Sequence, residues 1–187
     1  MKKITLLLMM LIISCRTVAI TTTDSRRNMN VKPGKYKLIS ENNDIKAKFL
    51  GKIIDYKLNK IGFSTANDKY DFLIKFNYTV TDSREIKSAY SYTNPYGYTT
   101  TTFNNTKLYI KYLKIVIEDN KSNLLWESQS NEEGWCPNII STSPELVVSI
   151  FQNFPNDSIN VRREFNDYNG ETSEIKSAFS DTNWSCQ

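Results

Sequence analysis

The chain has 187 residues, with 24 lysines and arginines against 20 aspartates and glutamates, and it contains no histidine. This length is enough for one domain with a core of its own and leaves little room for two. The lack of histidine removes the commonest general base and the commonest metal ligand, and the nearly balanced charge does not indicate a nucleic-acid partner.

The start of the chain has the layout of a secretory signal that ends in a cysteine. Two lysines precede an apolar run, residues 4–13, and Ser14 then leads to Cys15. The run is too short for a membrane span, which needs about 17 to 25 residues. The order apolar, apolar, small, cysteine resembles the lipobox of bacterial lipoproteins, in which the cysteine is acylated and becomes the first mature residue. The alternative is an ordinary signal peptide that is cut after Ala19.

An acylated Cys15 would hold the protein at a membrane, because several acyl chains bind stably where one chain does not. We therefore expect a lipid-anchored protein of the cell envelope. The next residue is Arg16 and not the aspartate that resembles an inner-membrane retention signal. If the source has two membranes, this favours the outer membrane, with the protein facing the periplasm.

The chain is expected to divide into four parts. These are a signal peptide at 1–14, a lipidated N-terminus with a flexible tether at 15–34, an α+β domain at 35–155, and a C-terminal extension at 156–187. The tether is expected because its residues are polar, with little to bury.

Hydrophobic periodicity predicts the elements of the domain. They are a strand at 35–40, an amphipathic helix at 45–61 capped from 42–44, a half-buried strand at 70–80, a hairpin at 86–103, strands at 107–117 and 124–130, and a second helix at 143–154. The extension contains at most one strand, near 159–165. The simplest architecture is an α+β fold, in which an antiparallel sheet of about five or six strands carries two helices packed on one face. Gly51, inside the first helix, costs about 1 kcal/mol and indicates close packing there.

Several short motifs follow one another at spacings that point to a known family. They are Asn59-Lys60-Ile61-Gly62-Phe63, Tyr70-Asp71-Phe72-Leu73-Ile74, Ile117-Glu118-Asp119, Leu124-Leu125-Trp126-Glu127 and the stretch from Ile150 to Pro155. In this order, behind a lipobox, they are similar to the signatures of the domain of unknown function 4136 family of bacterial lipoproteins, over about 35–155. The resemblance implies an envelope lipoprotein, and it implies no activity and no catalytic residue.

Two cysteines remain once Cys15 is assigned to lipid. In an oxidising compartment Cys136 and Cys186 could form a disulfide that ties the C-terminal extension back to the domain. The alternative is that both are free, buried thiols.

The most suggestive surface feature is a hairpin around a predicted turn at 94–97, where proline and glycine occupy favourable positions. It carries four tyrosines, Tyr90, Tyr92, Tyr96 and Tyr98. Tyrosine offers a rigid apolar ring with a polar tip, which suits an envelope protein partner or a glycan. The alternative is a cross-strand aromatic ladder that only stabilises the hairpin.

No motif identifies a reaction. The serines and threonines lack the context of a nucleophile, and we expect no catalytic residue, no metal site and no cofactor. We expect a membrane-anchored protein with a non-catalytic binding, accessory or structural role. One alternative is a carrier or receptor for a small glycan or lipid, which would need a hollow between sheet and helices. A less favoured one is a hydrolase that uses Glu132 or Glu133 with another carboxylate.

Overall fold

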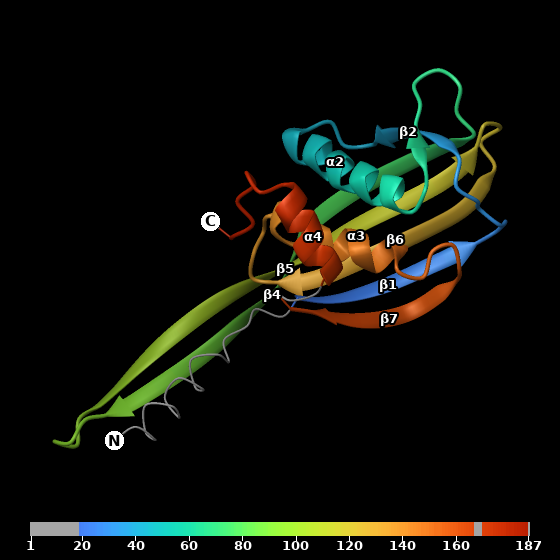
Figure 1. The fold of residues 1–187 in the computed structure, drawn as a ribbon. Helices are drawn as coiled ribbons and strands as arrows, with labels where there is room; N and C mark the ends of the chain where they lie inside the picture. The colour runs from blue at the N-terminus through green and yellow to red at the C-terminus, as the bar shows by residue number, and fades with distance from the viewer. Residues whose placement is uncertain (1–18, 167–169, 187) are drawn as a thin grey trace, which may run out of the picture.

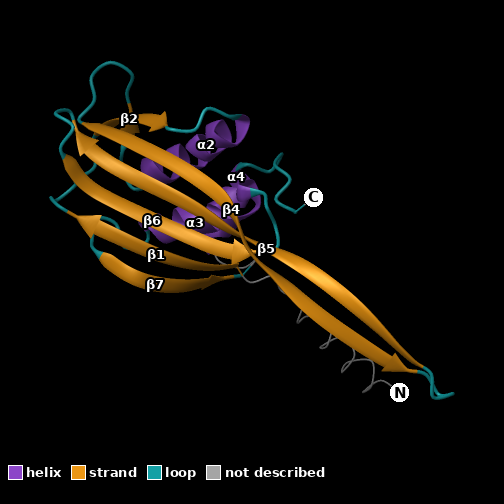
Figure 2. Ribbon diagram, turned by 180° about the vertical axis from the view of Figure 1, so that it is seen from behind, coloured by secondary structure: helices purple, strands orange, loops and turns teal. Residues whose placement is uncertain are grey.

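The computed structural model describes residues 19–166 and 170–186. Cys15, and with it the expected signal peptide and lipobox, lies outside the described residues. One seven-stranded sheet, in the order β3-β2-β4-β5-β6-β1-β7, carries helices on one side only (Figure 1; Figure 2). The strands are β1 (Ala19–Arg27), β2 (Lys35–Ser40), β3 (Ser64–Thr65), β4 (Phe72–Thr93), β5 (Thr99–Asp119), β6 (Leu124–Gly134) and β7 (Ser158–Phe165). The helices are α2 (Ile45–Lys60), the short 3₁₀ helix η2 (Ile139–Thr142), α3 (Ser143–Phe151) and α4 (Gly170–Ala178).

The expected antiparallel sheet of five or six strands is wrong, because the sheet is mixed and has seven strands. Strand β2 runs parallel to both of its neighbours, β3 and β4, while the other pairs are antiparallel. The cause is the helix α2 that follows β2. A helix that crosses over the sheet returns the chain to its starting end, so the next strand runs in the same direction.

The expected tether at 15–34 is also wrong over residues 19–27, which form β1, an inner strand between β6 and β7. Its side chains that face the helices are hydroxyls, and they are buried. The Oγ1 atom of Thr21 lies 2.7 Å from the Oγ atom of Ser149, and Thr23 donates to Ser130 over 3.0 Å. These hydrogen bonds satisfy polar groups that would otherwise be costly to bury.

The helix α2 agrees with its prediction. The carboxylate of Asp44 accepts a hydrogen bond of 2.7 Å from the backbone N–H of Ala47, which caps the first turn. Gly62 follows the helix with a φ of +94°, a backbone conformation that suits glycine. Inside the helix, a methyl group on Gly51 would lie 3.5 Å from the ring of Phe76, which is an ordinary contact.

Two of the helices lie directly on the sheet. The residues of α3 are all buried, and the ring of Phe151 stacks on Trp126 of β6 with centroids 6.0 Å apart. The third helix, α4, was not predicted. It packs on α3, and its Glu171 forms an ion pair with Lys57 of α2 (Figure 1). Its buried Ile175 joins the core, and its Lys176 lies 2.7 Å from Glu145 of α3. The segment expected to be an extension therefore supplies both an edge strand and an outer helix.

Among residues 19–166 and 170–186, none of the helices combines the length and the apolar character needed to span a membrane.

Candidate functional site

The longest hairpin of the sheet extends far beyond the body of the protein. Strand β5 pairs with β6 only as far as Tyr109 and Gly134. Beyond that point β4 and β5 continue as a two-stranded ribbon, which projects from the body in both views (Figure 1; Figure 2). We call residues 82–107 the arm. From Asp82 to Thr93 it is about 35 Å long at about 3.3 Å per residue.

The predicted turn at 94–97 is confirmed. The N–H of Gly97 donates to the carbonyl oxygen of Asn94 over 3.0 Å, and Gly97 has a φ of +83°. The side chain of Asn94 accepts from the N–H groups of Tyr96 and Tyr98 at 3.0 Å each. The hairpin that the sequence predicts at 86–103 is the outer part of two much longer strands, so it grows out of the sheet and is not a separate unit.

The four tyrosines of the arm do not form one stripe. Tyr90 and Tyr92 lie on one face of the ribbon, opposite Thr102 and Thr100. Tyr96 belongs to the turn and Tyr98 directly follows it, and Tyr96 is 85% exposed. None of the ring contacts found among the described residues joins two of these tyrosines. The cross-strand neighbours of Tyr90 and Tyr92 are thus threonines, and the arm holds no aromatic ladder.

The outer part of the arm carries no charge. Residues 88–106 contain no lysine, arginine, aspartate or glutamate, whereas the whole chain is 24% charged. The other large apolar side chains of the arm that are exposed are Ile86 and Phe103. Phe103 stands on the face opposite to the tyrosine pair, because its strand partner is Ala89. Sequence reasoning singled out the tyrosines and missed both Phe103 and the lack of charge, which a count of charged residues along the chain would have found.

Charged residues are gathered instead at the base of the arm. Glu85 is the register partner of Lys107, and Lys107 lies 2.7 Å from the carboxylate of Asp82. Arg84 lies 3.2 Å from Glu133 of β6. The boundary between charged base and uncharged outer part therefore crosses both strands at nearly the same level.

In the body next to the arm base, an ion pair is buried between the sheet and the helices. The Lys111 ammonium lies 2.6 Å from a carboxylate oxygen of Glu132. Burial raises the pKa of the Glu132 carboxyl above its ordinary value, and the nearby Lys111 opposes this shift. Glu133 lies on the other face of the sheet, where it accepts from Ser83. Consecutive strand residues point to opposite faces, so the two glutamates do not share one site.

A surface hollow of about 940 Å³ lies where β1, β5, β6 and the start of β7 meet. No helix residue lines it, so it is not the hollow between sheet and helices that a carrier was expected to have. Its charged lining residues are Asp24, Arg26, Arg27, Lys114, Glu127 and Asp157. Within residues 19–166 and 170–186, no three side chains of the kinds that bind metals come together.

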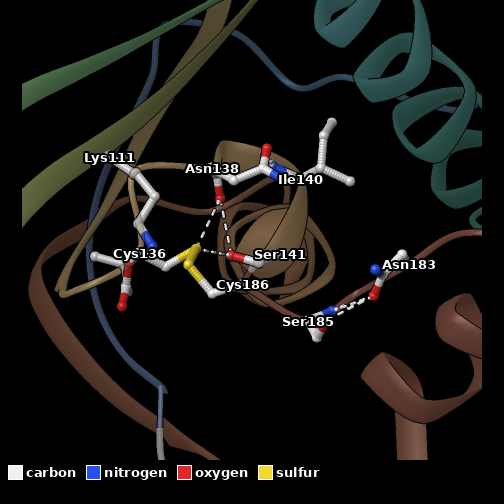
Figure 3. The surroundings of a disulfide bond; sticks show 9 residues. Lys111, Cys136, Asn138, Ile140, Ser141, Asn183, Ser185 and Cys186 are labelled. Atoms are coloured by element: carbon white, nitrogen blue, oxygen red, sulfur yellow. Dashed lines mark hydrogen bonds and ion pairs between the residues drawn. A yellow bond between two sulfur atoms is a disulfide. The ribbon is translucent and has the colours of Figure 1, made fainter.

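Cys136 and Cys186 form a disulfide, with their Cα atoms 5.6 Å apart (Figure 3). Of the two alternatives left open by the sequence, the structure has the bonded one. The hydroxyl of Ser141 donates to the Cys136 sulfur over 3.3 Å and to the carbonyl oxygen of Asn138 over 2.8 Å. The bond fixes the end of the chain beside the last residue of β6, at the same end of the body as the arm.

These features define an α+β protein with one mixed sheet, helices on one face and a projecting hairpin. The chain belongs to the family described as domain of unknown function (DUF4136), which matches over residues 17–156. The match begins at residue 17, before β1, so the family domain includes this inner strand of the sheet. No curated protein matches the chain.

Among solved structures, a PDZ domain protein from Parabacteroides distasonis is similar, with a TM-score of 0.50 and 16% identity. The similarity covers 81% of this chain but only 39% of that protein, so this chain spans about two fifths of its length. It concerns the fold alone. Two structures of the PelC dodecamer from Paraburkholderia phytofirmans, each 10% identical, have TM-scores of 0.41 and 0.43. The similarity covers 68% and 70% of this chain, and 93% and 94% of the two PelC chains.

Proposed function

We propose that this protein is a lipid-anchored, non-catalytic component of the bacterial cell envelope that acts by binding, and that the arm is its contact element. The anchor is Cys15, by resemblance of the preceding residues to a lipobox. In a bacterium with two membranes, the outer membrane is the favoured location, with the protein facing the periplasm, because Arg16 follows the cysteine.

The observation that carries the binding role is that, among the described residues, the outer arm packs against no other element of the fold. Nearly every residue from Ile86 to Thr106 is exposed. A free two-stranded ribbon is only marginally stable in water, and exposed strand edges invite pairing or aggregation. A protein gains no stability from such an element, so its presence favours a role in binding. Exposed rings without neighbouring charges are what a contact surface needs, since charged groups are costly to desolvate.

The anchor and the contact element call for separate tests. For the anchor, full-length protein and a Cys15→Ser variant are labelled with palmitate in growing bacteria, and membranes are separated. Label and membrane association should both be lost in the variant. A variant that is still labelled and still partitions with membranes would contradict the lipobox assignment.

For the arm, a photo-crosslinking amino acid is placed at Tyr96 or at Ile159. The two side chains are almost equally exposed, at 85% and 86%, but Ile159 lies at the far end of the body, where it borders the hollow. Crosslinks in intact cells should form at Tyr96 and not at Ile159. Equal crosslinking at both positions would contradict a special role of the arm.

A second candidate function is favoured by the 940 Å³ hollow, which could receive a small ligand. Because both basic and acidic groups line it, a polar ligand such as a glycan fits it better than a lipid. Titration of peptidoglycan fragments against the non-acylated protein tests this. Binding that an Arg26→Glu change abolishes would support a receptor, and absence of binding at millimolar concentration would exclude these ligands.

A further inference from the structure

The register of the strands places the beginning of β1 at the end of the body from which the arm leaves. Thr21 pairs with Glu132 near the end of β6, and β6 ends at Gly134, opposite Tyr109 at the base of the arm. In Figure 1, β1 accordingly starts beside the point where the arm departs and runs away from it. Only β6 separates β1 from β5, so Ala19 lies about 10 Å to the side of the arm base.

Little chain separates this end of the body from the proposed anchor. From Cys15 to Ala19 there are four residue steps, which span at most about 14 Å when fully extended. The arm is about 35 Å long, more than twice this reach. A body that is anchored through Cys15 therefore turns its arm end toward the lipid. Because the arm is longer than the linker, it meets the bilayer, and it avoids the hydrocarbon only by lying along the surface.

The composition of the arm fits this position. Charges end at Lys87 and Lys107, and the outer part carries exposed aromatic rings on both faces and in the turn. Tyrosine is enriched at the level of lipid headgroups, where one end of the ring is apolar and the other meets water. The threonines, the asparagines and the unpaired backbone edges of the ribbon need hydrogen bonds, which water and headgroups supply and hydrocarbon does not.

We infer that the outer arm, residues 88–106, lies in the headgroup region of the bilayer that carries the lipid anchor. This inference rests on the proposed anchoring through Cys15. Lys87, the last charged residue before the uncharged outer part, would then face anionic headgroups. Together the arm and the anchor give two points of attachment, so the body is held in one orientation and does not rotate freely about a single tether.

The test uses acylated protein extracted from membranes and reconstituted into vesicles of phosphatidylethanolamine and phosphatidylglycerol. Tyr96→Trp places a reporter at the arm tip, and Ile159→Trp places a matched one at the far end of the body, with almost the same exposure. Lipids brominated near the headgroup should quench most of the fluorescence that Tyr96→Trp adds to the parent protein. They should leave the fluorescence added by Ile159→Trp unchanged.

Flotation of the same vesicles separates failure of the inference from failure of the anchor. If the protein floats and the added tryptophan at the arm tip is not quenched, or is quenched no more than the one at position 159, the inference is overturned while the anchor stands. A protein or a glycan would then be the partner of the arm. If the acylated protein does not float, the proposed anchoring fails and the inference fails with it.

Discussion

Lys111 and Glu132 are register partners on β5 and β6, and their charged groups lie 2.6 Å apart in the interior of the protein. The Lys111 side chain is fully buried and that of Glu132 is 7% exposed. A second pair, Glu145 with Lys176, lies close enough for Glu145 to raise the pKa of the Glu132 carboxyl further. Burying such charges is costly, and it is tolerated only while each has its partner.

The first prediction follows from this dependence. Lys111→Met should destabilise the protein by about 3 to 5 kcal/mol, because it leaves a buried carboxylate without its partner. The double change Lys111→Met with Glu132→Leu should restore the stability or exceed that of the parent, because it removes both desolvation costs. Urea unfolding followed by circular dichroism measures both. A double variant no more stable than the single one would show that the pair itself holds the fold together.

The second prediction concerns Gly51 in α2. A methyl group there would make ordinary contact with the Phe76 ring, so the close packing expected from the sequence still leaves room for alanine. Gly51→Ala should stabilise the protein by up to about 1 kcal/mol and raise its melting temperature by about 2 to 4 °C. Gly62→Ala is the control, since its φ of +94° should make alanine unfavourable. A lower melting temperature for Gly51→Ala would mean that the Phe76 ring cannot accommodate the added methyl group.

The sequence predicted α2 closely because its signals are local. A capping aspartate, apolar residues three and four apart and a terminal glycine all lie within the element. Strand β1 carries no such signal, since its buried positions are Thr21, Thr23 and Ser25. Their partners, among them Ser149 and Ser158, are more than a hundred residues away in the chain. Every second residue of β1 is buried, but these residues are polar, so the pattern can be recognised only once their distant partners are known.

One repeated sequence shows directly where local information fails. The residues Glu-Ile-Lys-Ser-Ala occur at 85–89 and again at 174–178. The first copy is a strand of the arm, with Ile86 exposed, and the second is helix α4, with Ile175 buried. Pairing with a neighbouring strand selects one conformation, and packing on α2 and α3 selects the other. The arm could be predicted as a hairpin from its turn. Its projection from the body could not, because it arises where β6 ends and leaves the outer parts of β4 and β5 without a further neighbour.

The third prediction is a pH dependence at the start of α2. The carboxylate of Asp44 accepts from the Tyr78 hydroxyl at 2.6 Å and from the N–H of Ala47 at 2.7 Å. These hydrogen bonds lower the pKa of the Asp44 carboxyl below 3.8. The contribution of Asp44 to stability is therefore present above pH 3.8 and lost as the pH falls through the lowered value.

Asp44→Ala should thus lower the melting temperature at pH 7 by a few degrees and have little effect once the carboxylate is protonated. Asp44→Asn keeps a side chain that can cap the helix, so its melting temperature at pH 7 should lie between those of the parent and Asp44→Ala. Thermal unfolding of all three proteins from pH 2 to pH 7 gives the comparison. Parallel curves for parent and Asp44→Ala would refute the proposed linkage.

The last prediction separates two ways of holding the C-terminal segment. The disulfide joins residues 50 apart, and removing it with Cys136→Ser and Cys186→Ser should cost about 4 kcal/mol in the chain-entropy account. The helix α4 has further attachments, since Ile175 is buried and Lys176 pairs with Glu145. Hydrogen exchange in the double-serine variant should therefore become faster over 180–186, while α4 keeps most of its protection relative to the body. A Lys176→Ala variant with the disulfide intact should show the reverse, with a less protected helix and a fixed terminus. If α4 instead loses its protection together with 180–186 in the serine variant, the disulfide alone fastens the helix to the protein.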